Sequence, residues 1–255
     1  MWKHSITETW LTQNDAVVCR EITPAGYRLL HCPRADRAGG GTALLFKDSF
    51  NVRQLAVGEK SCFEFSEYLI DASSFEFRLV IIYRIPYSAV HPITSSTFFL
   101  EFNDYLDSLL LSKVPLCISG DFNFHLDVSG DVDAAKFADL LESMCLTQHV
   151  RSPTHIQGHI LDLVITRNSD NIIKGRPISH RYFSDHCSVL CSLSVPRPSP
   201  TVKHISFRNL KLWIWLHSKM ILLVLIFWWC WSWKTCWSVQ QHTAPPFRSS
   251  CSDHV

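Results

Sequence analysis

Two short apolar runs that end in polar residues constrain the fold of this chain more than any other feature. Residues 79–82 read Leu-Val-Ile-Ile, and residues 115–119 form a second run that leads directly into Gly120 and Asp121. Continuous runs of this length are typical of strands that are buried on both faces of a sheet. Between the two runs, apolar residues recur at helical spacing over residues 98–110. We therefore expect a buried sheet that is covered by helices.

Further strand and helix signals extend this pattern over one large domain. Ser95 or Ser96 is expected to cap the first helix, and Asp133 to cap a second one. Strands and helices mixed in one domain predict a layered α/β architecture. The expected strands cover residues 42–46, 63–69, 75–83, 115–119, 160–166 and 187–195.

Composition excludes two broad classes of protein. Hydrophobic residues make up 47% of the chain and charged residues 18%, which rules out a protein that is disordered throughout. Residues 1–200 contain 18 Lys and Arg against 22 Asp and Glu, so this part is not a basic protein that coats nucleic acid. Any affinity for phosphate must then come from a local site or from a metal ion.

The ten cysteines are scattered and form no Cys-x-x-Cys pair. Zinc sites use closer pairs, and disulfide-rich secreted domains are shorter and denser in cysteine. The first eleven residues contain no apolar stretch of signal-peptide length. We therefore expect reduced cysteines and an intracellular protein, either nuclear or cytoplasmic.

The C-terminal segment differs in character from the rest. Residues 201–255 hold seven of the nine tryptophans, and six basic residues against one acidic residue. Eighteen of the 22 residues at 212–233 are apolar, but Lys219 and a longest unbroken run of 12 residues argue against a membrane helix. Membrane association of this segment is one alternative, and a stretch translated out of frame is another. We expect a domain at residues 1–195 and, at residues 196–255, a Trp-rich tail that is not part of it and forms at most one helix.

Polar residues stand at the ends of the expected strands. Residues 120–123 (Gly-Asp-Phe-Asn) follow the second apolar run, and residues 184–186 (Ser-Asp-His) precede the last strand. Asp162 lies between two leucines, a costly position for a carboxylate without a partner. Glu8 and Tyr83 each end a β-prone segment. Each of these alone is consistent with an ordinary turn or surface residue, but their order along the chain is one joint pattern.

This ordered pattern resembles the endonuclease/exonuclease/phosphatase family, which has the DNase I-like fold. Within that family, the motifs are most similar to the endonuclease domains of LINE-type retrotransposons, which are akin to apurinic/apyrimidinic endonucleases. The resemblance covers roughly residues 4–195. It rests on Thr7-Glu8-Thr9-Trp10-Leu11, Gly39-Gly40-Gly41-Thr42, Tyr83-Arg84, Gly120-Asp121-Phe122-Asn123, Pro153-Thr154-His155, Gly158-His159-Ile160-Leu161-Asp162-Leu163-Val164-Ile165-Thr166 and Ser184-Asp185-His186.

The resemblance implies a fold and an activity. The fold is an α/β four-layer sandwich, in which two packed sheets are flanked by helices. The activity is Mg²⁺-dependent hydrolysis of phosphodiesters, with Mn²⁺ as a substitute ion and DNA as the substrate. A phosphodiester is anionic and repels hydroxide, so a hard cation on oxygen ligands must neutralise charge and stabilise the leaving oxygen.

The resemblance also implies roles on the metal and water side of the reaction. Glu8 matches the family's metal-binding glutamate, and Asp185 matches a second acidic residue on the metal side. Asp121 matches the aspartate that activates or positions the attacking water, and Asn123 matches the amide that holds this water. Such a base must lie within hydrogen-bond reach of the water.

The remaining matches are on the phosphate side. His186 matches the histidine that contacts the scissile phosphate, and Asp162 matches the carboxylate that orients this histidine. Tyr83 matches a phosphate-contacting tyrosine, and Thr154 a threonine near the phosphate. Because a nearby carboxylate favours the imidazolium, we expect Asp162 and His186 within hydrogen-bond distance of each other.

The sequence departs from the family pattern before Glu8. The family has another strand there, which brings an asparagine to the metal, whereas only seven residues precede Glu8 in this sequence. We therefore expect the first strand to be missing and nicking by the isolated chain to be weak. Two alternatives stay open: a remnant without catalytic role, and a phosphoesterase of the same fold that acts on lipid or nucleotide phosphates. His125 and His159 are expected at the rim of the site.

Overall fold

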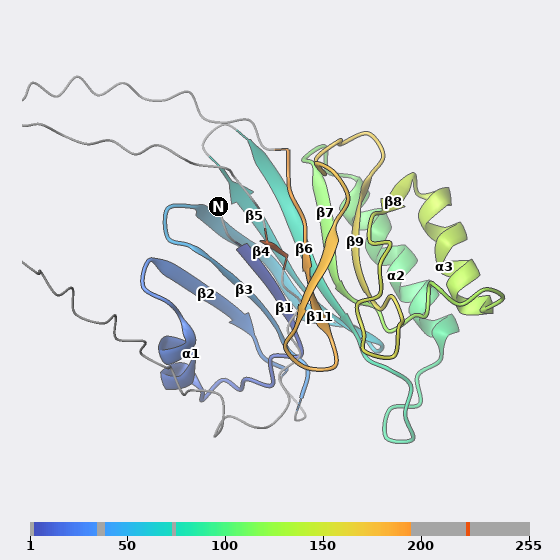
Figure 1. Ribbon diagram of the computed structural model, residues 1–255, viewed down its shortest axis with the longest axis horizontal. Coiled ribbons are helices and arrows are strands. Elements are labelled where there is room, and N and C mark those ends of the chain that lie inside the picture. Colours follow the sequence, from blue (N-terminus) through green and yellow to red (C-terminus); the bar gives the residue numbers. More distant parts are fainter. Residues whose placement is uncertain (1–2, 35–38, 73–74, 195–222, 225–255) are drawn as a thin grey trace, which may run out of the picture.

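The computed structural model describes residues 3–34, 39–72, 75–194 and 223–224 (Figure 1). The largest sheet consists of β4 (Asn51–Glu59), β5 (Phe63–Asp71), β6 (Glu76–Arg84), β7 (Leu116–Asp121), β8 (Leu146–Gln148) and β9 (Asp162–Arg167). Its strand order is β4-β5-β6-β7-β9-β8. The pair β6–β7 is parallel and its neighbours are antiparallel. Two strands in the middle of this sheet, β6 and β7, end at the residues Arg84 and Asp121.

Strand β6 shows why the central runs are continuously apolar. Leu79 and Ile81 lie in one hydrophobic core, whereas Val80 and Ile82 lie in the core on the opposite face of the sheet. All four side chains are at most 1% exposed. Because side chains alternate between the two faces of a strand, a strand that is covered on both faces needs an apolar residue at every position. The prediction of a doubly buried strand is confirmed here.

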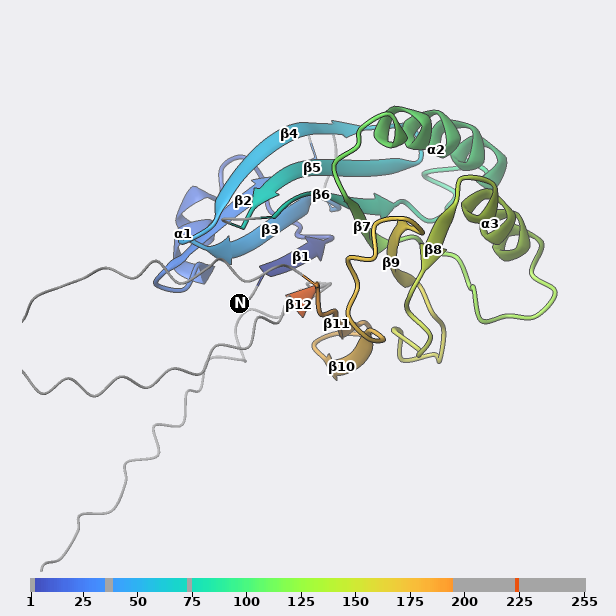
Figure 2. The same cartoon turned by 90° about the horizontal axis from the view of Figure 1, so that it is seen from above.

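Two three-stranded sheets cover one face of the large sheet (Figure 2). The first contains β1 (Lys3–Thr7), β2 (Tyr27–Cys32) and β3 (Thr42–Lys47) in the order β1-β3-β2, and the second contains β10 (Ile178–Tyr182), β11 (Cys187–Leu190) and β12 (Leu223–Val224) in that order. Phe46 of β3 and Val189 of β11 pack in the same core as Leu79. Both small sheets therefore form a second β layer that is packed face to face on the first.

Two helices cover the opposite face of the large sheet (Figure 2). They are α2 (Ser95–Leu110) and α3 (Val132–Ser143). An aromatic cluster joins them to the sheet, because the Phe102 ring centroid lies 5.9 Å from that of Phe63 in β5 and 5.9 Å from that of Phe137 in α3. Aromatic pairs at this spacing add to the stabilisation from buried area.

A short helix, α1 (Ala16–Ile22), lies on the outer side of the second β layer. Ile22 lines an apolar cavity of about 190 Å³ together with Leu29 of β2 and Leu45 of β3. The layers are thus α2 with α3, the large sheet, the two small sheets, and α1. The expected α/β sandwich of two packed sheets flanked by helices is confirmed.

Helix starts differ from the prediction in detail. Helix α2 follows Thr94, and among the described residues no side chain caps it, neither Ser95 nor Ser96. Asp131, not Asp133, caps α3, because its Oδ1 accepts the backbone N–H of Ala134 at 2.8 Å. Asp133 lies in the first turn instead, where its charge still favours the helix dipole.

The described part of the tail is a strand. Leu223 and Val224 form β12 and pair with Leu190 and Val189 of β11, whose backbone edge offers hydrogen-bonding groups to an extended segment. These two positions are thus extended, whereas we expected at most a helix over residues 212–233. The remaining residues of the segment considered for membrane association lie outside the described residues. None of the helices in the described ranges is long and apolar enough to cross a membrane.

Acidification is expected to weaken this fold through His4 in β1. Burial lowers the pKa of His4 to about 4, so the folded protein keeps the ring neutral while the unfolded chain protonates it below its ordinary pKa of about 6.5. The stability that depends on the neutral ring is lost as the pH falls from about 6.5 toward 4, by up to about 3 kcal/mol. Urea denaturation should show that the free energy of unfolding falls less between pH 7 and pH 4.5 in His4→Gln than in the wild type. Equal losses in both proteins would contradict the assignment.

Candidate active site

The ends of three strands bring three polar side chains together. Asp121 is the last residue of β7 and Asp162 the first of β9, and the two are register partners in the antiparallel pair. Side chains of directly opposed residues project to the same face. His186 immediately precedes β11 in the facing β layer. The ligand atoms of Asp121, Asp162 and His186 all lie within 4.8 Å of one another, and the three residues are buried.

The backbone before Asp121 requires a glycine. Gly120 is the register partner of Ile82 in the parallel pair β6–β7. A Cβ atom at residue 120 would lie 1.8 Å from the carbonyl oxygen of Ile82, far inside van der Waals contact. Gly120 therefore permits the close approach of the two strands that carry Tyr83 and Asp121.

We expect Gly120→Ala to lower the free energy of unfolding by about 3 kcal/mol or more, because the added methyl group overlaps a backbone atom that cannot move aside. The matched control is Gly130→Ala, since a Cβ atom there meets nothing within 4 Å. At residue 130 the free energy of unfolding should fall by only about 1 kcal/mol, because a side chain there is strained by the positive φ angle. Urea denaturation measures both values, and similar losses in the two variants would contradict the clash.

The loop after β7 joins Asp121 to Asn123. Asp121 Oδ1 accepts the backbone N–H of Asn123 at 3.0 Å, and Oδ2 accepts the side-chain amide Nδ2 at 3.2 Å. Asn123 has a φ of +51°, a left-handed conformation that asparagine adopts more readily than most residues. Burial, followed by the charge of Asp162, raises the pKa of Asp121 well above its ordinary value. The loop thus presents a carboxylate of increased proton affinity beside an amide.

Arg84, the last residue of β6, holds this loop in place. Its Nη1 donates to the carbonyl oxygen of Asn123 at 2.9 Å and to that of Phe122 at 3.3 Å. Asn123 Nδ2 in turn donates to the carbonyl oxygen of Arg84 at 2.8 Å. The guanidinium carbon lies 3.9 Å from the ring centroid of Phe124, which is a cation–π contact. Arg84 is therefore a positioning residue for Asn123.

Asp162 and His186 form a buried pair. His186 Nδ1 lies 2.8 Å from Asp162 Oδ2, so the expected contact is present. Burial alone would lower the pKa of His186, but the hydrogen bond and charge of Asp162, followed by the charges of Asp121 and Asp185, raise it to about 9. The imidazole is accordingly protonated at neutral pH, and its Nδ1–H is directed at the Asp162 carboxylate.

Thr154 supports the backbone of this pair. Its side chain is fully buried, and its Oγ1 accepts the backbone N–H groups of Leu161 at 3.0 Å and of Asp162 at 3.1 Å. The carbonyl oxygen of Thr154 also accepts the N–H of Cys187, the residue after His186, at 2.7 Å. Thr154 thus links the start of β9 to the start of β11.

Glu8 joins the site through Tyr83. Glu8 follows β1 with a φ of +50° and is 6% exposed. Its Oε2 accepts a hydrogen bond from Trp10 Nε1 at 3.3 Å, and the Tyr83 hydroxyl also donates to its carboxylate. Burial raises the pKa of Glu8, while these hydrogen bonds and the charge of His186 oppose the rise. The charge of Glu8 also acts on Asp121.

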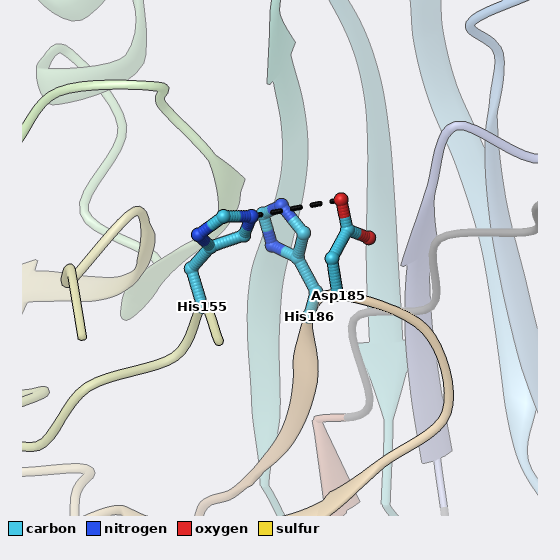
Figure 3. A group of neighbouring side chains, drawn as sticks. All are labelled: His155, Asp185 and His186. Carbon is cyan, nitrogen blue, oxygen red and sulfur yellow. Dashed lines mark ion pairs between the residues drawn. The ribbon is translucent and has the colours of Figure 1, made fainter. Parts of the chain in front are cut away.

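Asp185 lies in a second group of side chains that shares His186 with the first. The ligand atoms of His155, Asp185 and His186 are within 4.8 Å of one another. Figure 3 shows the His155 ring directed at the Asp185 carboxylate, with 3.5 Å between Nε2 and Oδ2. All eight residues that the sequence identified are thus placed, and hydrogen bonds link seven of them: Glu8 with Tyr83, Asp121 with Asn123, and Asp162 with both His186 and Thr154.

The two other histidines of the motifs belong to neither group in the described residues. The rings of His125 and His159 stack with their centroids 4.2 Å apart. His159 Nδ1 also lies 3.0 Å from Oδ2 of the exposed Asp127. These contacts explain both histidines as ordinary polar residues of two neighbouring loops, one after β7 and one before β9.

The donor set fits a divalent metal ion. Oδ1 of Asp162 and Oδ1 of Asp185 are buried and have no hydrogen-bond partner among the described residues. Buried carboxylate oxygens normally have a partner, and a cation would supply one. Carboxylates and an amide oxygen are hard ligands of the kind that Mg²⁺, Mn²⁺ and Ca²⁺ prefer. The carboxylates of the two groups could therefore hold a divalent metal ion, with the protonated His186 beside it.

Sequence reasoning assigned no role to three residues that the structure places at the site: Trp10, Arg84 and His155. Each is a neighbour, by one or two positions, of a residue that had a role: Glu8, Tyr83 and Thr154 respectively. That adjacency within the motifs was the available signal. It could not show that Trp10 donates to Glu8, that Arg84 holds the loop of Asn123, or that His155 faces Asp185.

Part of the chain matches a known protein family. Residues 77–190 match the model of a family described as Endonuclease-reverse transcriptase, a range that contains every expected site residue except Glu8. Comparison with curated proteins gives no match to this chain.

Solved structures share the fold at low sequence identity. The endonuclease domain of TRAS1, a telomere-specific non-LTR retrotransposon, is 14% identical with a TM-score of 0.53, covering 77% of this chain and 100% of that domain. TDP2 of D. rerio, complexed with a single-strand DNA product, is 12% identical with a TM-score of 0.54, covering 76% and 86%. The catalytic domain of human Nocturnin, with bound sulfate anion, is 15% identical with a TM-score of 0.52, covering 75% and 81%. The chain therefore has the DNase I-like fold that these nuclease and phosphatase structures share, and residues 77–190 resemble the endonuclease part of the matched family.

Proposed function

We propose that this protein is a divalent-metal-dependent endonuclease that nicks DNA, of the type found in LINE-type retrotransposons. The observation that carries the proposal is the convergence of Asp121, Asp162 and His186, with ligand atoms within 4.8 Å, from the ends of strands in two facing sheets. Further support comes from the likeness to a retrotransposon endonuclease domain and to a structure with a DNA product.

Asp121 and Asn123 act on the attacking water in this proposal. The carboxylate of Asp121 accepts a proton from the water while the water oxygen bonds to phosphorus. Asn123 orients the water through its side-chain amide, whose position is fixed by hydrogen bonds to Asp121 and to the carbonyl oxygen of Arg84. One P–O ester bond breaks as the new one forms, the leaving oxygen takes a proton from solvent water to become a hydroxyl group, and Asp121 returns its proton to the solvent.

His186 and Tyr83 act on the phosphate. The protonated imidazole of His186, held by Asp162, donates a hydrogen bond to a non-bridging phosphate oxygen and stabilises its developing charge. Tyr83 contacts the phosphate from the end of β6, beside Glu8. Thr154 contributes by fixing the backbone of Asp162.

Glu8 and Asp185 would hold the metal ion, and Mg²⁺ is the ion that we propose, with Mn²⁺ as its substitute. When bound, such an ion neutralises the phosphate charge and stabilises the leaving oxygen. The buried Oδ1 of Asp185, without a hydrogen-bond partner among the described residues, supports this assignment.

A plasmid assay tests the proposed function. Purified protein should convert supercoiled plasmid to relaxed circles in Mg²⁺ or Mn²⁺, EDTA should stop the conversion, and His186→Ala should abolish it. Nicking by the His186→Ala protein at the wild-type rate would overturn the proposal. Release of inorganic phosphate from nucleotides or lipid headgroups without nicking would favour the phosphoesterase alternative. Activity no higher than background in every assay would favour the alternative of a remnant without catalytic role. We still expect weak nicking by the isolated chain, and the nicking rate of the wild type in this assay tests that prediction.

A further inference from the structure

The loop between β8 and β9 is bound to the segment that carries Asp185 and His186. The N–H of Ile156 donates to the carbonyl oxygen of Asp185 at 2.8 Å, and the N–H of Cys187 donates to that of Thr154 at 2.7 Å. Between these bonds, His155 and His186 form an isolated antiparallel bridge. These backbone links fix the position of the His155 side chain relative to both functional residues.

The His155 side chain faces both Asp185 and His186. Its Nε2 lies 3.5 Å from Asp185 Oδ2, and the two side chains are 12% and 29% exposed. Its ring packs edge to face on the ring of His186, with 4.9 Å between centroids (Figure 3). One imidazole therefore contacts the carboxylate on the metal side and the imidazole on the phosphate side.

The hydrogen bonds of His155 indicate which of its nitrogens carries the proton. The backbone N–H of Gln157 donates to Nδ1 at 3.3 Å, so Nδ1 is the acceptor and Nε2 carries the hydrogen in the neutral ring. Nε2 is also the ring atom that lies 3.5 Å from Asp185 Oδ2. A ligand to a metal through Nε2 would need the opposite tautomer, with the proton on Nδ1.

We propose that His155 is a positioning residue for Asp185. The positive end of its Nε2–H bond attracts Oδ2 of Asp185 across 3.5 Å, and this leaves the buried Oδ1, which has no hydrogen-bond partner among the described residues, available to a cation. The inference rests on the proposed function, in which Asp185 is a metal ligand. Residues that orient a metal ligand typically change metal affinity by about 10–100-fold when they are replaced.

The test is metal binding by the full chain, measured without any substrate. Mn²⁺ binding is followed by the paramagnetic resonance signal of the free ion for the wild type, His155→Leu and His155→Gln. His155→Leu should weaken Mn²⁺ binding by about 10-fold. His155→Gln should retain most of the affinity, because its amide N–H can still reach Asp185. The matched control is His180→Leu, since His180 is an exposed histidine of β10.

A nicking assay adds a second readout. His155→Leu should raise the Mg²⁺ concentration for half-maximal nicking by the same factor, with the KM for plasmid unchanged and kcat at saturating Mg²⁺ within about 3-fold of the wild type. A purely structural role would lower kcat at every metal concentration. If His155→Leu does not fold, His155→Asn replaces it, because the shorter amide cannot reach Asp185 and should bind Mn²⁺ as weakly as the leucine variant was expected to.

The outcomes separate the inference from the proposed function. A wild type that binds Mn²⁺ in the predicted order of variants but does not nick DNA would overturn the function and leave the inference in place. Equal Mn²⁺ affinities in all variants, or a wild type that binds no Mn²⁺, would overturn the inference. A loss of Mn²⁺ affinity far above 100-fold in both the leucine and the glutamine variants would indicate that His155 is a direct metal ligand. That result would also overturn the inference.

Discussion

Asp121→Asn is expected to reduce the rate of plasmid nicking by about 10²–10⁴-fold. Asp121 is 2% exposed, and burial together with the charge of Asp162 raises its pKa. A carboxylate in this setting can take a proton from water, whereas a neutral amide cannot. The substitution keeps the size of the side chain, and the N–H of Asn123 can still donate to its carbonyl oxygen. The loss should therefore fall on kcat with the fold intact.

The control for this variant is Asp104→Asn on the exposed side of α2. It removes the same charge from the protein but lies outside both groups of side chains that could hold a metal. Its nicking rate and its urea midpoint should equal those of the wild type. An Asp121→Asn protein that nicks at more than about a tenth of the wild-type rate would exclude Asp121 as the base, since general-base catalysis contributes about 10²-fold or more.

Asp162→Asn is the second variant with a large expected effect, a loss of about 10²–10⁴-fold in kcat. Asp162 is fully buried, and its Oδ2 lies 2.8 Å from His186 Nδ1. Removal of the charge takes away the main support of the imidazolium, and the amide can present an N–H where the histidine needs an acceptor. The same Asp→Asn change in the histidine–aspartate pair of a serine protease lowers kcat by about 10⁴-fold. The measurement is single-turnover nicking at saturating metal.

A double-variant cycle tests whether the two residues act as one unit. His186→Gln and Asp162→Asn should each cause a large loss, and the combined variant should lose little more than His186→Gln alone, because residues of one unit are not additive. Asp139→Asn on the exposed face of α3 is the charge-matched control. Strictly multiplicative losses in the cycle would contradict a shared role.

The segments of the large sheet could be predicted from the sequence because their signals are local. Residues 79–82 are apolar at every position, and the two cores on either side of β6 require this. The helical spacing of Phe98, Phe102 and Leu106 likewise corresponds to the buried side of α2. By contrast, β4 was not predicted, because most of its residues are exposed and it lies at the edge of the sheet, where composition is little constrained.

The eight expected site residues were also accessible from the sequence, through the order of short motifs at strand ends. Their roles are those that the resemblance of these motifs to a known family implies, and the roles stay predictions. The motifs could not show which residues meet. Asp121 and Asp162 are 41 positions apart and become partners only through the antiparallel pair β7–β9. His186 joins them only because the second β layer packs on the first.

Tertiary structure alone decided how each functional group is held and charged. The pKa of His186 rises to about 9 mainly because Asp162 and Asp121, from two other strands, lie beside it, and its sequence neighbour Asp185 adds to the rise. Arg84 reaches the loop of Asn123 because β6 and β7 are parallel neighbours, and His155 reaches Asp185 because the loop before β9 is bound to the segment before β11. Local sequence sets the strand and helix tendencies and supplies the reactive groups. Burial, electrostatic environment and contact partners depend on long-range packing, which brings together residues that no local pattern connects.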